Sequence, residues 1–467
     1  MSAYLRLLYD RRLLFIFILG FASGFPWALI GNTFSAWLHE SGLTRTAIGV
    51  LGSLAMIYAL NFLWAPLLDR VKLPLLHRRL GQRRSWILLT QGGILLGTLA
   101  ISTTNPAMGT LPTALAALLI VASSATQDVA VDAYRIELVP AMEPQKMAAA
   151  SAMTTAGWWT GAGLPSATAF MLAGPLGWSG AYLFMGLILA CLMLVVMRLP
   201  EPQTDREAQQ AEAERNIREA LARSASRPGL AARATAWLAV TAVEPFAEFF
   251  RRNGWQLALA ILSFIVLFKI GEAFMGRMAA VFYLEVGFSR EQIAWVSGYM
   301  GWATMLLFTL LGGLVNVSLG IFRGLLIGGI TMALANLLFA LLAVVGPDMQ
   351  LFALAVVVDN FTTAFSTVTF VAFISYLTSR VYTASQYALM ASLGNLSRTT
   401  LAAGSGALVD WLGGDWATFF VITTIMVTPG LILLLLIRTA LTRRMGAAFS
   451  SGRPPPDTDK ATTPPSR

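Results

Sequence analysis

The sequence predicts an all-α integral membrane protein with about twelve transmembrane helices, arranged as two six-helix parallel repeats. Three observations lead to this prediction. The chain of 467 residues is 56% hydrophobic and only 12% charged, with a mean hydropathy of +0.67, whereas soluble domains carry about 25% charged residues. Apolar runs of about 20 residues, long enough to cross a bilayer, recur along the chain. Short sequences in the first half also reappear in the second.

The apolar runs divide the chain into four parts. Residues 1–198 form an N-terminal six-helix half, 199–254 a polar cytoplasmic linker, 255–443 a C-terminal six-helix half and 444–467 a disordered Pro- and Ser-rich tail. Within the linker, 229–250 is expected to form an amphipathic helix on the membrane surface. The predicted spans are centred near Gly24, Met56, Gly93, Ala122, Trp159, Leu187, Lys269, Ala303, Thr331, Thr363, Arg398 and Val427.

Basic residues predict the orientation of the spans. Of the 33 Lys and Arg residues, only Arg45 and Arg290 fall in loops on one side, and three fall within spans. The rest gather on the other side, which the positive-inside rule assigns to the cytoplasm. We therefore expect both termini to be cytoplasmic. The same distribution explains the net charge of +9 without a nucleic-acid partner.

Two pairs of short sequences indicate an internal duplication. Gly42-Leu-Thr-Arg-Thr-Ala-Ile48 resembles Gly287-Phe-Ser-Arg-Glu-Gln-Ile293, and 145–151 resembles 386–392. In the first pair a hydroxyl residue is placed to cap the following helix, and Ser289 with Gln292 forms a capping box. Two six-helix halves of like orientation are typical of the major facilitator fold, which holds its substrate near mid-membrane between the halves.

The composition argues against an enzyme and against a bound cofactor or metal. The single cysteine, Cys191, cannot form an intramolecular disulfide. His39 and His77 both fall in polar loops, which removes an intramembrane metal ligand or general base. The chain contains no P-loop sequence. A membrane sensor would usually carry a folded output domain, and none is predicted.

The loop after the second span carries a candidate gate. Leu67-Leu-Asp69-Arg70 and the later Gly81-Gln-Arg-Arg84 resemble the facilitator motif Gly-x-x-x-Asp-Arg followed by Gly-Arg-Arg, although Ala65 replaces the first glycine. Asp69 and Arg70 are predicted to join helix ends and latch the cytoplasmic side. Positive-inside anchoring explains the other arginines of the loop: Arg78, Arg79, Arg83 and Arg84. In the second half Asn316 occupies the aspartate position.

Ionisable residues within spans are costly and therefore candidates for function. Span four contains Gln127, Asp128 and Asp132, with the two carboxylates four residues apart on one helix face. Repulsion and burial favour retention of a proton by such a pair. Asp128 and Asp132 are therefore predicted to couple transport to protons. The alternative is a static ion-pair network, for example between Asp132 and Arg70.

The second half contains the candidate anion site. Lys269, Glu272 and Arg277 lie in span seven, Asp359 in span ten and Arg398 in span eleven. An arginine fork suits carboxylate or phosphate, so Lys269 and Arg398 predict an anionic substrate, with Glu272 holding Lys269 when the site is empty. The alternative is a permanent Arg398–Asp359 pair.

Glycine and tryptophan residues suggest further substrate contacts. Gly24-Phe-Pro26 in the first span and Gly157-Trp158-Trp159 in the fifth are expected to interrupt their helices at mid-depth, as at many transporter sites. The indoles of Trp158 and Trp159 could then stack on sugar rings. Helix packing among small residues is the alternative, and Tyr299 and Trp302 allow the same two interpretations.

Several motifs together resemble the AmpG muropeptide permeases, a branch of the major facilitators. The resemblance covers about residues 13–438 and rests on stretches of the first, second, fourth, seventh and eleventh spans and of the linker: 19–26, 62–70, 124–134, 249–253, 267–274 and 386–389. It implies proton-driven uptake of N-acetylglucosaminyl-1,6-anhydro-N-acetylmuramyl peptides across a bacterial inner membrane, serving peptidoglycan recycling and β-lactamase induction. It leaves open a carrier of another organic anion, such as an acyl-CoA, or a drug exporter. We expect no cofactor besides the proton gradient, and a monomer in the lipid bilayer.

Overall fold

The computed structural model describes residues 10–139, 144–202, 241 and 243–445, and within these ranges every regular element is helical. Most of the predicted linker and all but the first two residues of the predicted tail lie outside these ranges. The described part of the linker includes α13 (Glu244–Asn253). It overlaps the end of the surface helix expected over 229–250 and continues three residues further.

The N-terminal half contains six spans. The first is formed by α2 (Arg11–Ile30) and α3 (Asn32–Glu40). The second is broken into α4 (Arg45–Gly52), η1 (Ser53–Met56), α5 (Ile57–Leu60), η2 (Asn61–Leu63) and α6 (Ala65–Arg70). After the short α7 (Leu76–Leu80), α8 (Gln82–Ser102) and α9 (Thr110–Leu138) are the third and fourth. The fifth and sixth together form α10 (Pro144–Val196), within which Gly177 has non-helical dihedral angles.

The C-terminal half repeats this order. Its first span consists of α14 (Trp255–Phe268) and α15 (Ile270–Val286), which meet at Lys269. The next contains α16 (Arg290–Ile293), the π-helical η4 (Ala294–Met300) and α17 (Gly301–Leu319). Then follow α18 (Ile321–Val345) and α19 (Met349–Leu377). The eleventh span is α20 (Thr383–Thr399), η5 (Leu401–Gly404) and α21 (Ser405–Trp411), and the last is α22 (Trp416–Met445).

The prediction of about twelve spans is confirmed. Nine helical segments in the described ranges are long and apolar enough to cross a membrane. One of them, 146–196, contains two spans joined at Gly177. The broken segments 45–70 and 383–411 supply the other two.

Local structure supports the predicted duplication. Gly42 and Gly287 both adopt positive φ angles, of 81° and 111°, just before a helix. Ser289 and Gln292 form the expected reciprocal capping box at 2.8 and 3.2 Å. Thr44 also accepts the expected hydrogen bond from the Ala47 amide at 3.2 Å. The two sequences therefore build the same turn at equivalent positions of the two halves.

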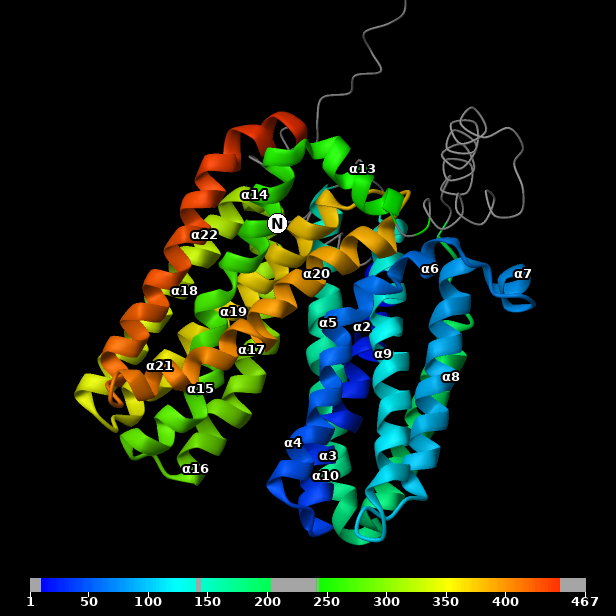
Figure 1. Ribbon diagram of the computed structural model, residues 1–467, viewed down its shortest axis with the longest axis horizontal. Coiled ribbons are helices and arrows are strands. Elements are labelled where there is room, and N and C mark those ends of the chain that lie inside the picture. The colour runs from blue at the N-terminus through cyan, green and yellow to red at the C-terminus, as the bar shows by residue number, and fades with distance from the viewer. Residues whose placement is uncertain (1–9, 140–143, 203–240, 242, 446–467) are drawn as a thin grey trace, which may run out of the picture.

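The halves also pack symmetrically. The fifth span, in α10, packs on the eighth, in α17, and the eleventh, in α20, packs on the second, in α5 and α6. An exchange of the halves converts one of these pairings into the other. In Figure 1 the two groups of helices meet around α6 and α20 and diverge toward α3, α4 and α16.

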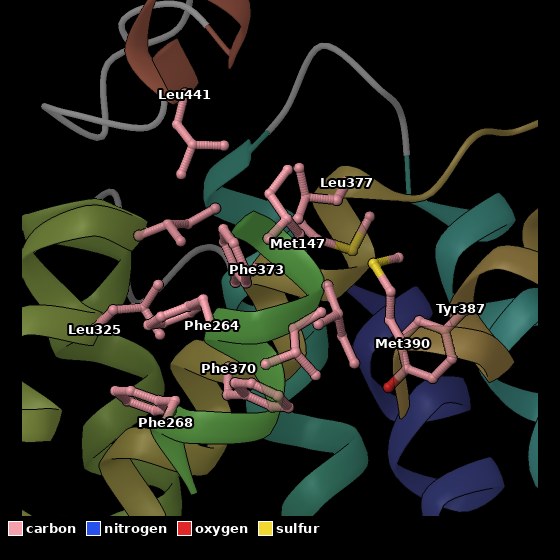
Figure 2. Close-up of a cluster of buried hydrophobic side chains, with 14 of the residues drawn as sticks. Met147, Phe264, Phe268, Leu325, Phe370, Phe373, Leu377, Tyr387, Met390 and Leu441 are labelled. Carbon is pink, nitrogen blue, oxygen red and sulfur yellow. The ribbon is translucent and has the colours of Figure 1, made fainter. Parts of the chain in front are cut away.

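Apolar side chains from both halves close the interface near α20. One core cluster joins Met147 of α10 to Phe264, Phe370 and Tyr387 of the C-terminal half. Figure 2 shows Met147 beside Leu377, with the phenylalanines to one side and Tyr387 and Met390 to the other. The halves are thus held together by burial of apolar surface as well as by polar contacts.

The glycines expected to interrupt the first and fifth spans instead allow these helices to pack closely, so that expectation was wrong. Both helices continue through the glycines. A Cβ atom at Gly24 would lie 2.1 Å from the Trp158 carbonyl oxygen, and one at Gly161 would lie 2.1 Å from the Phe21 oxygen. Gly20 and Gly157 meet the opposite helix in the same way. Glycines four residues apart on each helix let the two backbones touch.

We predict that Gly161→Leu lowers the thermal stability of the purified protein in detergent. The new side chain would collide with backbone, and overpacking of this kind costs about 1–3 kcal/mol. Gly174→Leu, in the same helix but with no atom within 4 Å of its Cβ position, is the matched control. Equal melting temperatures for the two variants would contradict the packing role.

Candidate functional site

Asp69 connects the two halves at one end of the bundle. This end carries the segment 71–81, Val139 at the end of α9 and the loop 378–382, and we call it the basic end. The buried Asp69 carboxylate accepts hydrogen bonds from the Ala384 amide at 3.1 Å, the Ser385 amide at 3.0 Å and the Ser385 hydroxyl at 2.6 Å. These amides begin α20, where the helix dipole favours an anion. Asp69 therefore caps a helix of the opposite half, as a latch would.

Arg83 completes the latch, although the sequence indicated only membrane anchoring for it. Its side chain is 1% exposed and contacts Asp69 at 2.8 Å and Glu137 at 2.5 Å. Glu137 in turn accepts a hydrogen bond from Thr383 of α20 at 2.6 Å. The anchoring interpretation of Arg83 was wrong because the loop folds back and buries this residue between two carboxylates.

Glu201 positions Arg83. Its carboxylate accepts hydrogen bonds from the amides of Arg83 at 2.7 Å and Arg84 at 3.1 Å, at the start of α8. Burial raises the pKa of Glu201, and these hydrogen bonds and the two nearby arginines oppose that rise. No local pattern could predict this contact, because Glu201 lies more than a hundred residues from its partners in the sequence.

The second half has no equivalent charged latch at the aspartate position. Asn316 is buried at 3% exposure, and neither of its side-chain polar atoms has a hydrogen-bond partner. Arg70, predicted to act with Asp69, ends α6 at the basic end. Arg83 is a basic partner of Asp69 that the sequence did not predict, and the gating role of Arg70 stays a prediction.

A second polar contact between the halves involves Asp132. Its carboxylate pairs with Arg135 at 3.0 Å, and not with Arg70 as the static alternative suggested. Arg135 is fully buried and reaches Ser375 of α19 at 3.0 Å. Its guanidinium also lies over the Tyr387 ring, 5.4 Å from the centroid. Arg135 was missed as a site residue, although its i,i+3 spacing from Asp132 was a usable signal.

Asp128 lies on the same helix, one turn further from the basic end. Its carboxylate accepts a hydrogen bond from the Ser23 hydroxyl of α2 at 2.5 Å. The neighbouring Gln127 is fully buried and donates to the Ala22 carbonyl at 2.7 Å, while its own side-chain oxygen has no hydrogen-bond partner. Asp128 is thus held by a neutral hydroxyl and Asp132 by a cation, so the two carboxylates do not have equivalent surroundings.

Lys269 occupies the break between α14 and α15. Its ammonium donates to Glu272 at 2.6 Å, to Ser366 at 2.8 Å and to Thr367 at 3.1 Å. Lys269 and Glu272 are 3% and 8% exposed. The predicted pairing of these two residues is confirmed.

Asp359 and Arg398 are the other two residues of the candidate anion site. Asp359 is half-buried on α19, and its Oδ1 atom is buried without a hydrogen-bond partner. Arg398 belongs to α20, but its side chain lies outside the described part of the chain, so the proposed Arg398–Asp359 pair stays a prediction. Arg277 is exposed.

Aromatic residues cluster where α2 and α10 meet. Trp158 packs edge-on to Trp159 and to Trp27, and Trp27 stacks on Tyr58 at 5.3 Å. Trp158 and Trp159 are both half-buried. In the described ranges no group of three His, Cys, Asp or Glu side chains could hold a metal ion.

We predict that Arg83→Gln weakens the basic-end contact between the halves. Ala388 is 2% exposed and packs on the N-terminal half. Ala388→Cys, in a Cys191→Ser background, therefore reports separation of the halves through its accessibility to a thiol reagent. Loss of the buried ion pairs should raise the rate at which a maleimide labels this cysteine at least about tenfold. A tenfold change corresponds to about 1.4 kcal/mol in the free energy of opening.

Arg79→Gln, at an exposed residue of the same loop, is the matched control for this measurement. Equal labelling in the Arg83 and Arg79 variants would show that the buried ion pairs do not hold the halves together.

Comparison with known proteins agrees with this architecture. Residues 16–283 match the family model described as Major Facilitator Superfamily. The chain is 32% identical to the "Putative transporter AmpG 4" of Rickettsia conorii, over 92% of this chain and 97% of that protein. It is 31% identical to the "Anhydromuropeptide permease" of Escherichia coli K12, over 94% of this chain and 82% of that protein.

Among solved structures, the proton:xylose symporter XylE has the same fold, with a TM-score of 0.64 and 15% identity over 96% of this chain and 100% of that one. The order of the spans, the symmetrical pairing of the halves and these matches lead to one conclusion. The chain is a multi-pass membrane transporter that belongs to the major facilitator superfamily, and within it to the family of AmpG permeases.

Proposed function

We propose that the protein is a proton-coupled symporter that imports anhydro-muropeptides from the periplasm to the cytoplasm of a bacterium. The observation that carries the proposal is the similarity to the Escherichia coli anhydromuropeptide permease along nearly the whole membrane part. The imported ligands would be N-acetylglucosaminyl-1,6-anhydro-N-acetylmuramyl peptides, which combine carboxylates with sugar rings. Their uptake would supply peptidoglycan recycling and the induction of β-lactamase.

The positive-inside rule assigns the basic end to the cytoplasm of the inner membrane. The interhalf hydrogen bonds of the described residues extend from the Arg380–Val139 contact in the loops at this end to the Ser392–Asn61 contact between α20 and η2. With the latch formed, the basic end is closed, and a substrate would enter from the opposite, periplasmic side.

The anionic part of the ligand would bind in the C-terminal half. Lys269 supplies a buried cation at the break of span seven, held by Glu272 and two hydroxyls. Arg398 and Asp359 come from neighbouring spans and complete the proposed set. A ligand carboxylate would replace Glu272 at Lys269, so the empty site is kept paired until substrate arrives.

The sugar rings would bind on the N-terminal side. Trp158 and Trp159 lie on α10 with their rings nearly perpendicular, at 88°, so one can present a face while the other supports it. Gln127 has a free acceptor oxygen on the neighbouring α9, which suits a sugar hydroxyl or amide. Aromatic faces and amides are common partners of small-molecule ligands.

Proton coupling in the N-terminal half would involve Asp128 and Asp132. Among the described residues, Asp132 has a cationic partner in Arg135, whereas the hydrogen-bond partner of Asp128 is the neutral Ser23 hydroxyl. A carboxyl without a cation is easier to protonate in a low-dielectric setting. Asp128 is therefore the better candidate of the two to take up a proton, and Asp132 the better candidate to respond through the contact of Arg135 with the other half.

The direct test is uptake by proteoliposomes. We predict that purified protein accumulates radiolabelled anhydro-muropeptide when the outside is made acidic, and that a protonophore abolishes this accumulation. Uptake of a different organic anion or export of an amphipathic drug, with no muropeptide uptake by folded protein, would refute the proposed substrate.

We further predict that Asp128→Asn loses gradient-driven accumulation, because the amide cannot exchange a proton. With a gradient of one pH unit, each coupled proton contributes about a tenfold accumulation, so at least that factor should be lost. Asp410→Asn, at an exposed residue of α21, should accumulate substrate normally. Unchanged accumulation in Asp128→Asn would exclude this residue from coupling.

A further inference from the structure

The C-terminal half contains a compact cluster with an excess of negative charge. Lys269 at the α14–α15 break, Glu272 on α15 and Asp359 on α19 interact electrostatically with one another. Among the described side chains of this cluster, one cation therefore faces two carboxyl groups. If both carboxyls were ionised, the cluster would have a net charge of −1 within the membrane-spanning part of the protein, which is costly.

Among the described residues, the hydrogen bonds of Lys269 go to groups other than Asp359. Its ammonium has three donors, and it donates to Glu272 at 2.6 Å, to Ser366 at 2.8 Å and to Thr367 at 3.1 Å. The short distance to Glu272 marks that residue as the counter-ion. Asp359 is left as the carboxyl whose charge the cation does not fully balance.

Asp359 also lacks hydrogen bonds that would stabilise an anion. Its Oδ1 atom is buried without a partner, and the amide of its neighbour Asn360 points elsewhere, to Gly301 and Thr304 of α17. In the described part of the chain, the Tyr283 phenol of α15 also lies near Asp359 and is buried. A half-buried carboxyl with one buried oxygen that lacks a hydrogen-bond partner is favoured in its protonated form.

We propose that Asp359 binds a transported proton and that the Lys269–Glu272 ion pair sets how tightly the proton is held. This inference rests on the proposed function for the coupling of transport to protons and for the identity of the substrate. When a substrate anion takes the place of Glu272 at Lys269, both carboxyls lose their cation. Binding of the anion then strengthens binding of the proton, and this mutual dependence is what symport requires.

The first test needs no substrate. A pH jump from 9 to 6, followed with an indicator dye on the purified protein in detergent, should show that wild-type protein takes up about one proton more per chain than Asp359→Asn. Equal proton uptake by the two proteins would overturn the proposal, whatever the protein transports.

The second test uses the ion pair. In Glu272→Gln the Lys269 charge becomes available to Asp359, so the anionic form is favoured and protonation needs a more acidic solution. An opposite charge nearby shifts such a titration by about one unit or more. The pH of half-maximal proton uptake should therefore move to lower pH in Glu272→Gln, and no shift or a shift to higher pH would overturn the proposal. Asp410→Asn should behave as wild type.

Transport then separates this inference from the proposed function. In proteoliposomes that import anhydro-muropeptide, Asp359→Asn should lower gradient-driven accumulation about tenfold more than it lowers exchange of substrate in the absence of a gradient. An unchanged ratio of accumulation to exchange would refute the role of Asp359 while leaving the proposed substrate intact.

Absence of muropeptide uptake by the wild-type protein would refute the proposed substrate, and the proton titration would still decide whether Asp359 binds a proton. If the Arg398 charge also acts on Asp359, Arg398→Gln should move the pH of half-maximal proton uptake to a higher value. A shift in Arg398→Gln larger than the shift in Glu272→Gln would overturn the assignment of control to the Lys269–Glu272 pair.

Discussion

The requirement that buried charges be compensated explains most of the polar architecture. A charge placed within a membrane bundle is costly unless a partner lies close to it. Arg83 is enclosed by Asp69 and Glu137, Arg135 by Asp132 and Ser375, and Lys269 by Glu272 and two hydroxyls. In the first two cases the compensating groups extend to the opposite half. Compensation of charge and contact between the halves are therefore achieved by the same atoms.

Because the same atoms compensate buried charge and join the halves, a conformational change that separates the halves also removes the partners of these charges. The contacts of Asp69 with the first amides of α20 and of Arg135 with Ser375 cannot survive if the halves separate at the basic end. Separation would leave buried charges that need water or substrate as new partners. The interface can thus occupy a closed state with protein partners or an open state with solvent partners, and partly open states lack both. A two-state element of this kind is what a rocking carrier needs.

The sequence predicted the spans well and the long-range partners poorly, for physical reasons. Bilayer thickness fixes the length of an apolar run, and caps such as Ser289 with Gln292 depend on residues three positions apart, so both can be read locally. Arg83 could not be distinguished from its exposed loop neighbour Arg79, because its burial depends on Glu137 and on α20, far along the chain. The glycines at 24 and 161 indicated an unusual backbone, but a kink and a close helix contact require the same residue type, and only the structure separates them. The Lys269–Glu272 pair was predictable because both members lie on one helical segment.

The difference between Asp69 and Asn316 shows how far the two halves have diverged in function. In the symmetrical arrangement Asn316 occupies the position of the latch aspartate, yet it is neutral, buried and without a hydrogen-bond partner. Breaking a buried ion pair costs about 3–5 kcal/mol, whereas a change of about 5.5 kcal/mol already moves a two-state equilibrium from 1:99 to 99:1. Two charged latches at the same end would therefore hold that end closed more strongly than the binding of one substrate and a proton could reverse. A latch with charge in only one half would keep the closed and open states within reach of each other. Under the proposed function, the ionisable groups of the C-terminal half, at Lys269, Glu272 and Asp359, would then respond to ligand and proton.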